Sequence, residues 1–183
     1  EIGADVVLFS GDKLMGGPQA GIIAGKKKYI DLMKNHQLAR VVRVDKMTLA
    51  ALEETMRIYR DPKRAAAQIP VLSMVTRPRE ELTRMAENFA ALLNSLGMEA
   101  EFSAADSVAR IGGGSAPMLD IPSSCVTIET SRFSSDELAE RLRLRALPII
   151  VRIHEGKVLV DMRTVSEEEL VEIRLALVDI FAS

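Results

Sequence analysis

Residues 10–21 read SGDKLMGGPQAG, and they place one lysine between two apolar segments. The apolar run of residues 6–9 leads into this stretch, and a second apolar pair, residues 22–23, follows it. Short apolar runs bounded by glycine-rich turns are typical of buried strands. We therefore predict strands over residues 5–9 and 20–24, with Lys13 on the loop that joins them.

The order of strand, small polar residues, lysine, glycine turn and strand is typical of enzymes that bind pyridoxal 5'-phosphate (PLP) covalently. That chemistry needs an amine fixed at the rigid end of a strand. Ser10, three residues before Lys13, can place its hydroxyl on the cofactor phosphate. Gly16 and Gly17 would let the backbone approach an anion closely, and with Gln19 they would shape a loop at the cofactor and at a subunit contact.

Other interpretations of Lys13 stay open on the residues alone. A lysine after a strand is usually a solvated loop residue, and turn geometry alone could explain Gly16 and Gly17. A P-loop is excluded, because its glycines precede the lysine and a Ser or Thr follows it, where Leu14 stands here. A dinucleotide site is excluded too, since no Gly-x-Gly-x-x-Gly opens a helix at this point.

Three further segments extend the pattern: residues 36–52 (HQLARVVRVDKMTLAAL), 111–115 (IGGGS) and 119–123 (LDIPS). Together with the lysine segment, they make nearly the whole chain resemble the bacterial L-seryl-tRNA(Sec) selenium transferases. The resemblance covers only the C-terminal part of that family's length. We therefore expect the chain to be a fragment that is inactive by itself and binds PLP weakly or not at all.

The resemblance implies a fold and an activity for the full-length protein. The fold class is α/β: residues 1–70 form the end of the PLP-binding large domain with a connecting helix, and residues 71–183 form a small α+β C-terminal domain. The implied activity converts seryl-tRNA(Sec) to selenocysteyl-tRNA(Sec), with selenophosphate as the selenium donor. A cytoplasmic homo-oligomer that binds selenocysteine tRNA is implied as well, with Lys13 as the cofactor lysine.

Arg40 and Arg43 are a second candidate site. They lie three residues apart beside Lys46, so a helical turn can point them the same way. A guanidinium fork binds phosphate-like oxyanions better than a lysine does. Spacing alone favours an exposed basic face in contact with solvent or tRNA phosphates, whereas the resemblance implies that both arginines bind selenophosphate.

Two rival functions remain open. A PLP-dependent lyase acting on a small phosphorylated amino acid or amino sugar would use the same lysine and a phosphate-binding arginine. A non-catalytic interaction domain or truncated paralogue would need neither. The upstream sequence of the gene separates the transferase from a fragment or paralogue. A full-length front half with an N-terminal RNA-binding domain would support the transferase, and its absence would support a fragment or paralogue.

Composition excludes several classes of protein. The net charge is −2, but residues 1–64 carry +4 and residues 65–183 carry −6, so the basic part coincides with the candidate site. The single cysteine, Cys125, excludes an internal disulfide and is expected to be a buried, inert thiol. His36 and His154 do not make a metal site, and no apolar run approaches about 18 residues, so no membrane span is expected.

The periodicity of the remaining chain predicts further elements. We expect helices over residues 26–33, 47–59, 65–68, 80–96 and 136–144, a last helix after the Ser166–Glu169 capping box, short strands near 99–103, 109–111 and 125–130, and a hairpin of 149–153 with 158–162. The stripe expected inward on residues 80–96 is Leu82, Met85, Phe89, Leu92, Leu93 and Leu96. Arg152 could hold a substrate carboxylate or be structural, and the Gly112–Ser115 loop could line the site or merely connect.

Overall fold

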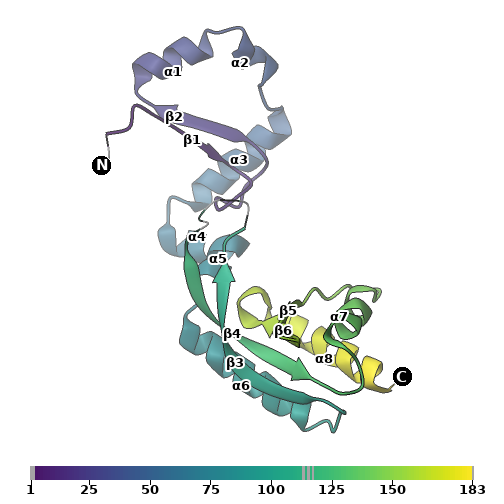
Figure 1. The fold of residues 1–183 in the computed structure, drawn as a ribbon. Helices are drawn as coiled ribbons and strands as arrows, with labels where there is room; N and C mark the ends of the chain where they lie inside the picture. The colour runs from purple at the N-terminus through teal and green to yellow at the C-terminus, as the bar shows by residue number, and fades with distance from the viewer. Residues whose placement is uncertain (1–2, 113, 115, 117, 183) are drawn as a thin grey trace. The chain divides into compact units, whose positions relative to one another are not determined.

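The computed structural model describes residues 3–112, 114, 116 and 118–182. It divides the chain into two compact units, Glu1–Thr76 and Arg77–Ser183, which we describe separately (Figure 1). Both units combine helices with a sheet, and this mixture is compatible with the expected α/β class. No helix in the described part of the chain is both long and apolar enough to cross a membrane.

In its described residues, 3–76, the first unit is a β-hairpin followed by five helices. Strands β1 (Val6–Ser10) and β2 (Gly21–Gly25) pair antiparallel, with Ser10 opposite Gly21. The helices are α1 (Lys27–Lys34), α2 (Leu38–Val41), α3 (Lys46–Ile58), α4 (Pro62–Gln68) and α5 (Pro70–Thr76). The hairpin is therefore confirmed to within one residue, whereas α2 and α5 were not predicted.

Aspartates determine where α3 and α4 begin. The Asp45 carboxylate accepts hydrogen bonds from the backbone N–H groups of Met47 (2.7 Å) and Thr48 (3.0 Å). Asp61 caps α4 in the same way, and Pro62 occupies the first helical position, where no N–H is needed. The half-buried face of α3 includes Thr55, and it continues to Tyr59 just after the last helical residue.

The described part of the second unit is one antiparallel sheet with three α-helices. The helices are α6 (Arg79–Asn94), α7 (Ser135–Arg143) and α8 (Glu167–Ala182), with a short 3₁₀ turn, η1 (Met162–Thr164). The strands are β3 (Glu101–Arg110), β4 (Asp120–Glu129), β5 (Arg152–His154) and β6 (Lys157–Asp161), in the order β3-β4-β6-β5. Ser134 caps α7, and the expected capping box is present, because Ser166 and Glu169 bond reciprocally at the start of α8.

The expectation of separate strands near residues 99–103 and 109–111 was wrong. Both belong to the ten-residue strand β3, which pairs with β4 along its whole length. The polar residues in its middle hid this continuity. They are tolerated because β3 is an edge strand, where Asp106 forms an ion pair with Arg79 of α6 at 2.6 Å.

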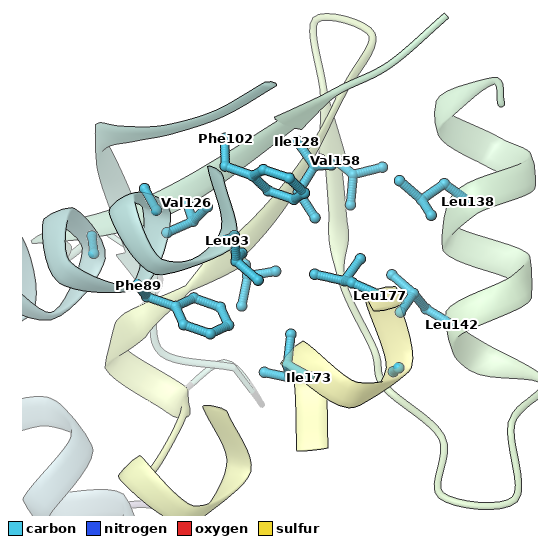
Figure 2. Close-up of a cluster of buried hydrophobic side chains, with 14 of the residues drawn as sticks. Phe89, Leu93, Phe102, Val126, Ile128, Leu138, Leu142, Val158, Ile173 and Leu177 are labelled. Atoms are coloured by element: carbon cyan, nitrogen blue, oxygen red, sulfur yellow. The ribbon is translucent and has the colours of Figure 1, made fainter. Parts of the chain in front are cut away.

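The hydrophobic core lies between one face of this sheet and α6, α7 and α8 (Figure 2). Phe102 lies opposite Ile128, and Val126 lies opposite Val160, so these side chains share the core face. The predicted inward stripe of α6 needs one correction, because Leu92 and Leu96 are 45% and 40% exposed. Buried Ala86 and Ala90 allow the helix to lie close to the sheet instead.

Candidate active site

Hydrogen bonds within the loop close the turn that carries Lys13. The Gly11 N–H donates to the Ala20 carbonyl at 2.8 Å, which continues the hairpin beyond Ser10. The Gly16 N–H donates to the Lys13 carbonyl at 2.9 Å, and the Gly17 N–H donates to the Gly11 carbonyl at 2.8 Å. Lys13 therefore lies in a closed turn at the end of β1.

The loop glycines are required by packing as well as by turn geometry. Gly16 has a φ of +67°, and a Cβ there would lie 2.4 Å from Cγ2 of Ile69. A Cβ on Gly17 would lie 3.2 Å from the side chain of Thr55 on α3. Because both N–H groups already bond within the loop, these glycines act by shape and do not offer their amides to an anion.

Tyr59, at the C-terminal end of α3, contacts the same loop through its hydroxyl. Its hydroxyl donates to the Met15 carbonyl at 3.0 Å and lies 3.4 Å from the Leu14 carbonyl. Partial burial raises the pKa of Tyr59 above its ordinary value, so the hydroxyl stays protonated. The sequence predicts a helix over residues 47–59 but gives no sign of this contact.

The side chains that could bind a cofactor extend from this fixed backbone. Lys13, Ser10 and Gln19 are exposed, and in the described part of the chain their side chains have no hydrogen bond or ion pair. A free amine at the end of a strand, with a free hydroxyl three residues before it, fits an aldehyde that carries a phosphate. The residues present therefore suit PLP.

Arg40 and Arg43 lie at the other end of α3. Arg40 is in the last turn of α2, and Arg43 lies two residues before the Asp45 cap. Both side chains are exposed, and among the described residues neither guanidinium has an ion pair or a hydrogen bond. The thirteen residues of α3 span about 20 Å between these arginines and the Tyr59 end, which contacts the lysine loop. Among the residues that the structure describes, no hydrogen bond or ion pair joins the arginine pair to Lys13.

Arg152 is held in a network within the second unit. Its guanidinium donates to Asp161 Oδ2 at 2.5 Å, to Ser107 Oγ at 2.6 Å and to the Val108 carbonyl at 3.1 Å. Asp161 also accepts a bond from Ser123 Oγ at 2.6 Å. These contacts give Arg152 a structural role that joins β3, β4, β5 and β6.

Other candidates carry no chemistry. Cys125 is buried, and desolvation raises the pKa of its thiol, so it is the inert thiol expected. His154 is exposed on the β5–β6 hairpin. Among the described residues, no group of His, Cys, Asp and Glu side chains could hold a metal. Gly113 and Ser115 of the Gly112–Ser115 loop lie outside the described residues.

Comparison with known proteins identifies the family. The family model described as L-seryl-tRNA selenium transferase matches residues 1–166. The chain belongs to this family. It is 43% identical over 169 residues to the L-seryl-tRNA(Sec) selenium transferase of Geobacter sulfurreducens, an alignment that covers 92% of this chain and 37% of the relative.

Two further relatives agree with this assignment. The L-seryl-tRNA(Sec) selenium transferase of Clostridium botulinum strain Hall is 44% identical over 92% of this chain and 37% of its own length. That of Geotalea daltonii is 42% identical over 96% of this chain and 38% of its own length. The chain therefore spans a little over a third of the length of the curated relatives that it matches.

Proposed function

We propose that the full-length protein is a PLP-dependent enzyme that converts seryl-tRNA(Sec) to selenocysteyl-tRNA(Sec), and that Lys13 is its cofactor lysine. The observation that carries this proposal is the free amine of Lys13 on a hydrogen-bonded loop at a strand end, in a chain of this family. Family membership favours the transferase over a lyase that acts on a small phosphorylated substrate.

Each residue of the loop has a distinct part in this proposal. Lys13 holds the cofactor through Nζ, and Ser10 Oγ donates to its phosphate. Gly16, Gly17 and Gln19 shape the loop on which these two groups are presented, and Gln19 extends toward a subunit contact. Bound PLP supplies an electron sink for the α-carbon of the seryl group. The Lys13 amine, when it is not bonded to the cofactor, would be the base that accepts the α-proton of the seryl group.

Arg40 and Arg43 supply the second part of the site. Their exposed, unpaired guanidinium groups would bind the oxyanion of selenophosphate. The neighbouring helix begins at the Asp45 cap, which fixes the backbone just after Arg43. The full-length protein would be a cytoplasmic homo-oligomer with selenocysteine tRNA as its macromolecular partner. Its fold would be that of a PLP-dependent transferase, in which this chain ends the large domain and forms the small one.

A lysine replacement tests the proposal directly. In the full-length protein, Lys13→Ala should abolish both the visible absorbance of bound cofactor and selenocysteyl-tRNA formation, because no other group provides the covalent attachment. Lys63→Ala, an exposed lysine on α4, is the matched control and should behave like the wild type. A Lys13→Ala protein that keeps its visible spectrum and its turnover would refute the assignment.

A further inference from the structure

The α3 helix presents two side chains to the lysine loop from adjacent turns. Thr55 and Tyr59 are four residues apart, so they lie on the same face of the helix. Thr55 packs where a side chain on Gly17 would otherwise lie, at 3.2 Å from the position of its Cβ. Tyr59 bonds to the Met15 and Leu14 carbonyls. The helix thus contacts the loop on both sides of Gly16.

The hydrogen bonds within the loop do not fix it by themselves. They join Gly11, Lys13, Gly16 and Gly17 to one another and to the start of β2, so the turn could still move as a unit. The contact from Tyr59 joins this turn to a helix forty-four residues later in the sequence than Met15. A hydroxyl that stays protonated in its half-buried position is suited to donate this bond.

We propose that Tyr59 is a positioning residue for Lys13, whose hydroxyl fixes the loop so that the lysine amine is held where it meets the cofactor. This inference rests on the proposed function of Lys13. Tyr59 does not touch the reacting atoms, and it acts through the Met15 carbonyl, two residues after the lysine. Removing its hydroxyl frees the loop to sample other positions, and binding then has to restore the order that was lost.

The test is Tyr59→Phe in the full-length protein, with Tyr29→Phe as the matched control. Tyr29 is the other tyrosine of the chain, lies half-buried on α1, and its hydroxyl has no hydrogen-bond partner in the described residues. Tyr59→Phe should speed amide hydrogen exchange at Gly16 and Gly17 in the cofactor-free protein. It should raise the dissociation constant for PLP roughly three- to tenfold, the usual value of one neutral hydrogen bond, and weaken the visible circular dichroism of bound cofactor. Tyr29→Phe should change none of these.

Two results of the Tyr59→Phe experiment would overturn the inference. Unchanged exchange at Gly16 and Gly17, together with wild-type affinity for PLP, would overturn the inference. A lower melting temperature without any change in affinity or visible circular dichroism would also overturn it, because a merely structural contact gives that result. If Lys13→Ala keeps its bound cofactor, the proposed function fails instead, and the exchange measurement still shows whether Tyr59 orders the loop.

Discussion

Lys13 combines an exposed amine with a backbone that is fixed on both sides. The amine needs access to the cofactor, whereas its backbone must not move, because each freely rotating bond that has to be ordered on binding costs free energy. The loop meets both needs. The Gly16 N–H bonds to the Lys13 carbonyl, the Gly11 N–H bonds to the Ala20 carbonyl, and the Tyr59 hydroxyl bonds to the Met15 carbonyl. No partner in the described residues restrains the Lys13 side chain. This division between a fixed backbone and a free side chain is what a covalent cofactor site would require.

Gly16 provides a sharp test of the loop geometry. Gly16→Ala in the full-length protein should destabilise the loop, because alanine at a φ of +67° is strained and its Cβ would collide with Ile69. Gly97→Ala is the matched control: its φ is +69°, and a Cβ there meets nothing within 4 Å. We expect Gly97→Ala to cost about 1–2 kcal/mol of stability from backbone strain alone. Gly16→Ala should cost more stability than Gly97→Ala and should also weaken PLP binding. Equal losses of stability in the two variants would contradict the contact between Gly16 and Ile69.

Arg40 and Arg43 are predicted to act on the selenium donor. Replacing either by Ala should spare PLP binding and reduce selenium addition roughly ten- to a hundredfold, since a hydrogen bond to a charged group contributes about 1.5–3 kcal/mol. Lysine at either position should restore only part of the rate, because a point charge cannot replace the guanidinium fork. The measurement is donor saturation in the full-length enzyme.

The control for the arginine pair is Arg60→Ala, an exposed arginine just after α3. It should leave donor saturation unchanged. If Arg40 and Arg43 contact tRNA phosphates instead, their replacement would weaken seryl-tRNA binding in a salt-dependent manner. Normal donor saturation with weakened tRNA binding would refute the donor-site role.

For single residues, the sequence predicts a role where the residues that share it lie close together along the chain. Ser10, Lys13 and the loop glycines are recognisable because they lie within one short stretch. Tyr59 is not, because a tyrosine at the end of an amphipathic helix has many possible partners, and its contact with Met15 is made only by tertiary folding. The pairing of Arg152 with Asp161 is hidden for the same reason.

Helix α3 connects the two candidate regions, and its first turn is predicted to depend on pH. Hydrogen bonds from the backbone and side chain of Thr48, and then from the Met47 backbone, hold the pKa of Asp45 below its ordinary value. The stabilisation is therefore present at neutral pH and is lost as the pH falls through the lowered pKa of the folded state. Asp45→Ala should speed amide exchange at Met47 and Thr48 at pH 7.

The control for this cap is Asp12→Ala, which removes an exposed carboxylate from the lysine loop. It should leave exchange at Met47 and Thr48 unchanged. The difference between Asp45→Ala and the wild type should shrink once the pH is below the pKa of Asp45 in the folded protein. A difference that persists unchanged into that acidic range would contradict capping by the carboxylate.

Neighbouring leucines on α6 test the packing of the second unit. Leu93 is 0% exposed in the core, whereas Leu92 is 45% exposed on the same helix. Leu93→Ala should lower the free energy of unfolding by about 2–5 kcal/mol, because it removes buried methyl groups and leaves a cavity. Leu92→Ala should cost far less. Urea denaturation of the full-length protein measures both, and similar losses would contradict the observed orientation of α6.

Elements with strong periodicity or clear caps could be predicted from the sequence, and others could not. The helix around residues 80–96 and the capping box at Ser166 follow from local patterns. The exact inward stripe of α6 does not, because Ala86 and Ala90 are buried for their small size and not for their hydrophobicity. Strand β3 was divided in the prediction because its middle is polar, and only its pairing with β4 shows that it is continuous.

The two units differ greatly in the number of hydrophobic side chains that they bury. Every residue of the buried hydrophobic cluster belongs to Arg77–Ser183. In Glu1–Thr76, the buried side chains among the described residues are those of Ala20, Ala65 and Ile69, whereas Leu8 is 70% exposed on β1. A chain segment with so little buried apolar area cannot offset its conformational entropy.

This asymmetry predicts how the two units behave when they are expressed separately. Residues 77–183 should fold alone, with a cooperative thermal transition measured by circular dichroism. Residues 1–76 should show no cooperative transition and no protected amides at the Gly16 turn. A cooperative, well-protected fold of residues 1–76 by themselves would contradict the burial pattern.

The central claim is that Lys13 carries the cofactor, and chemical trapping tests it most directly. The full-length protein is loaded with PLP and reduced with borohydride, which makes the covalent link permanent, and its peptides are then mapped by mass spectrometry. We predict that the reduced cofactor is found on the peptide that contains Lys13. The assignment of Lys13 would be wrong if the reduced cofactor were found on another lysine, such as Lys26 at the end of the hairpin, or on no lysine.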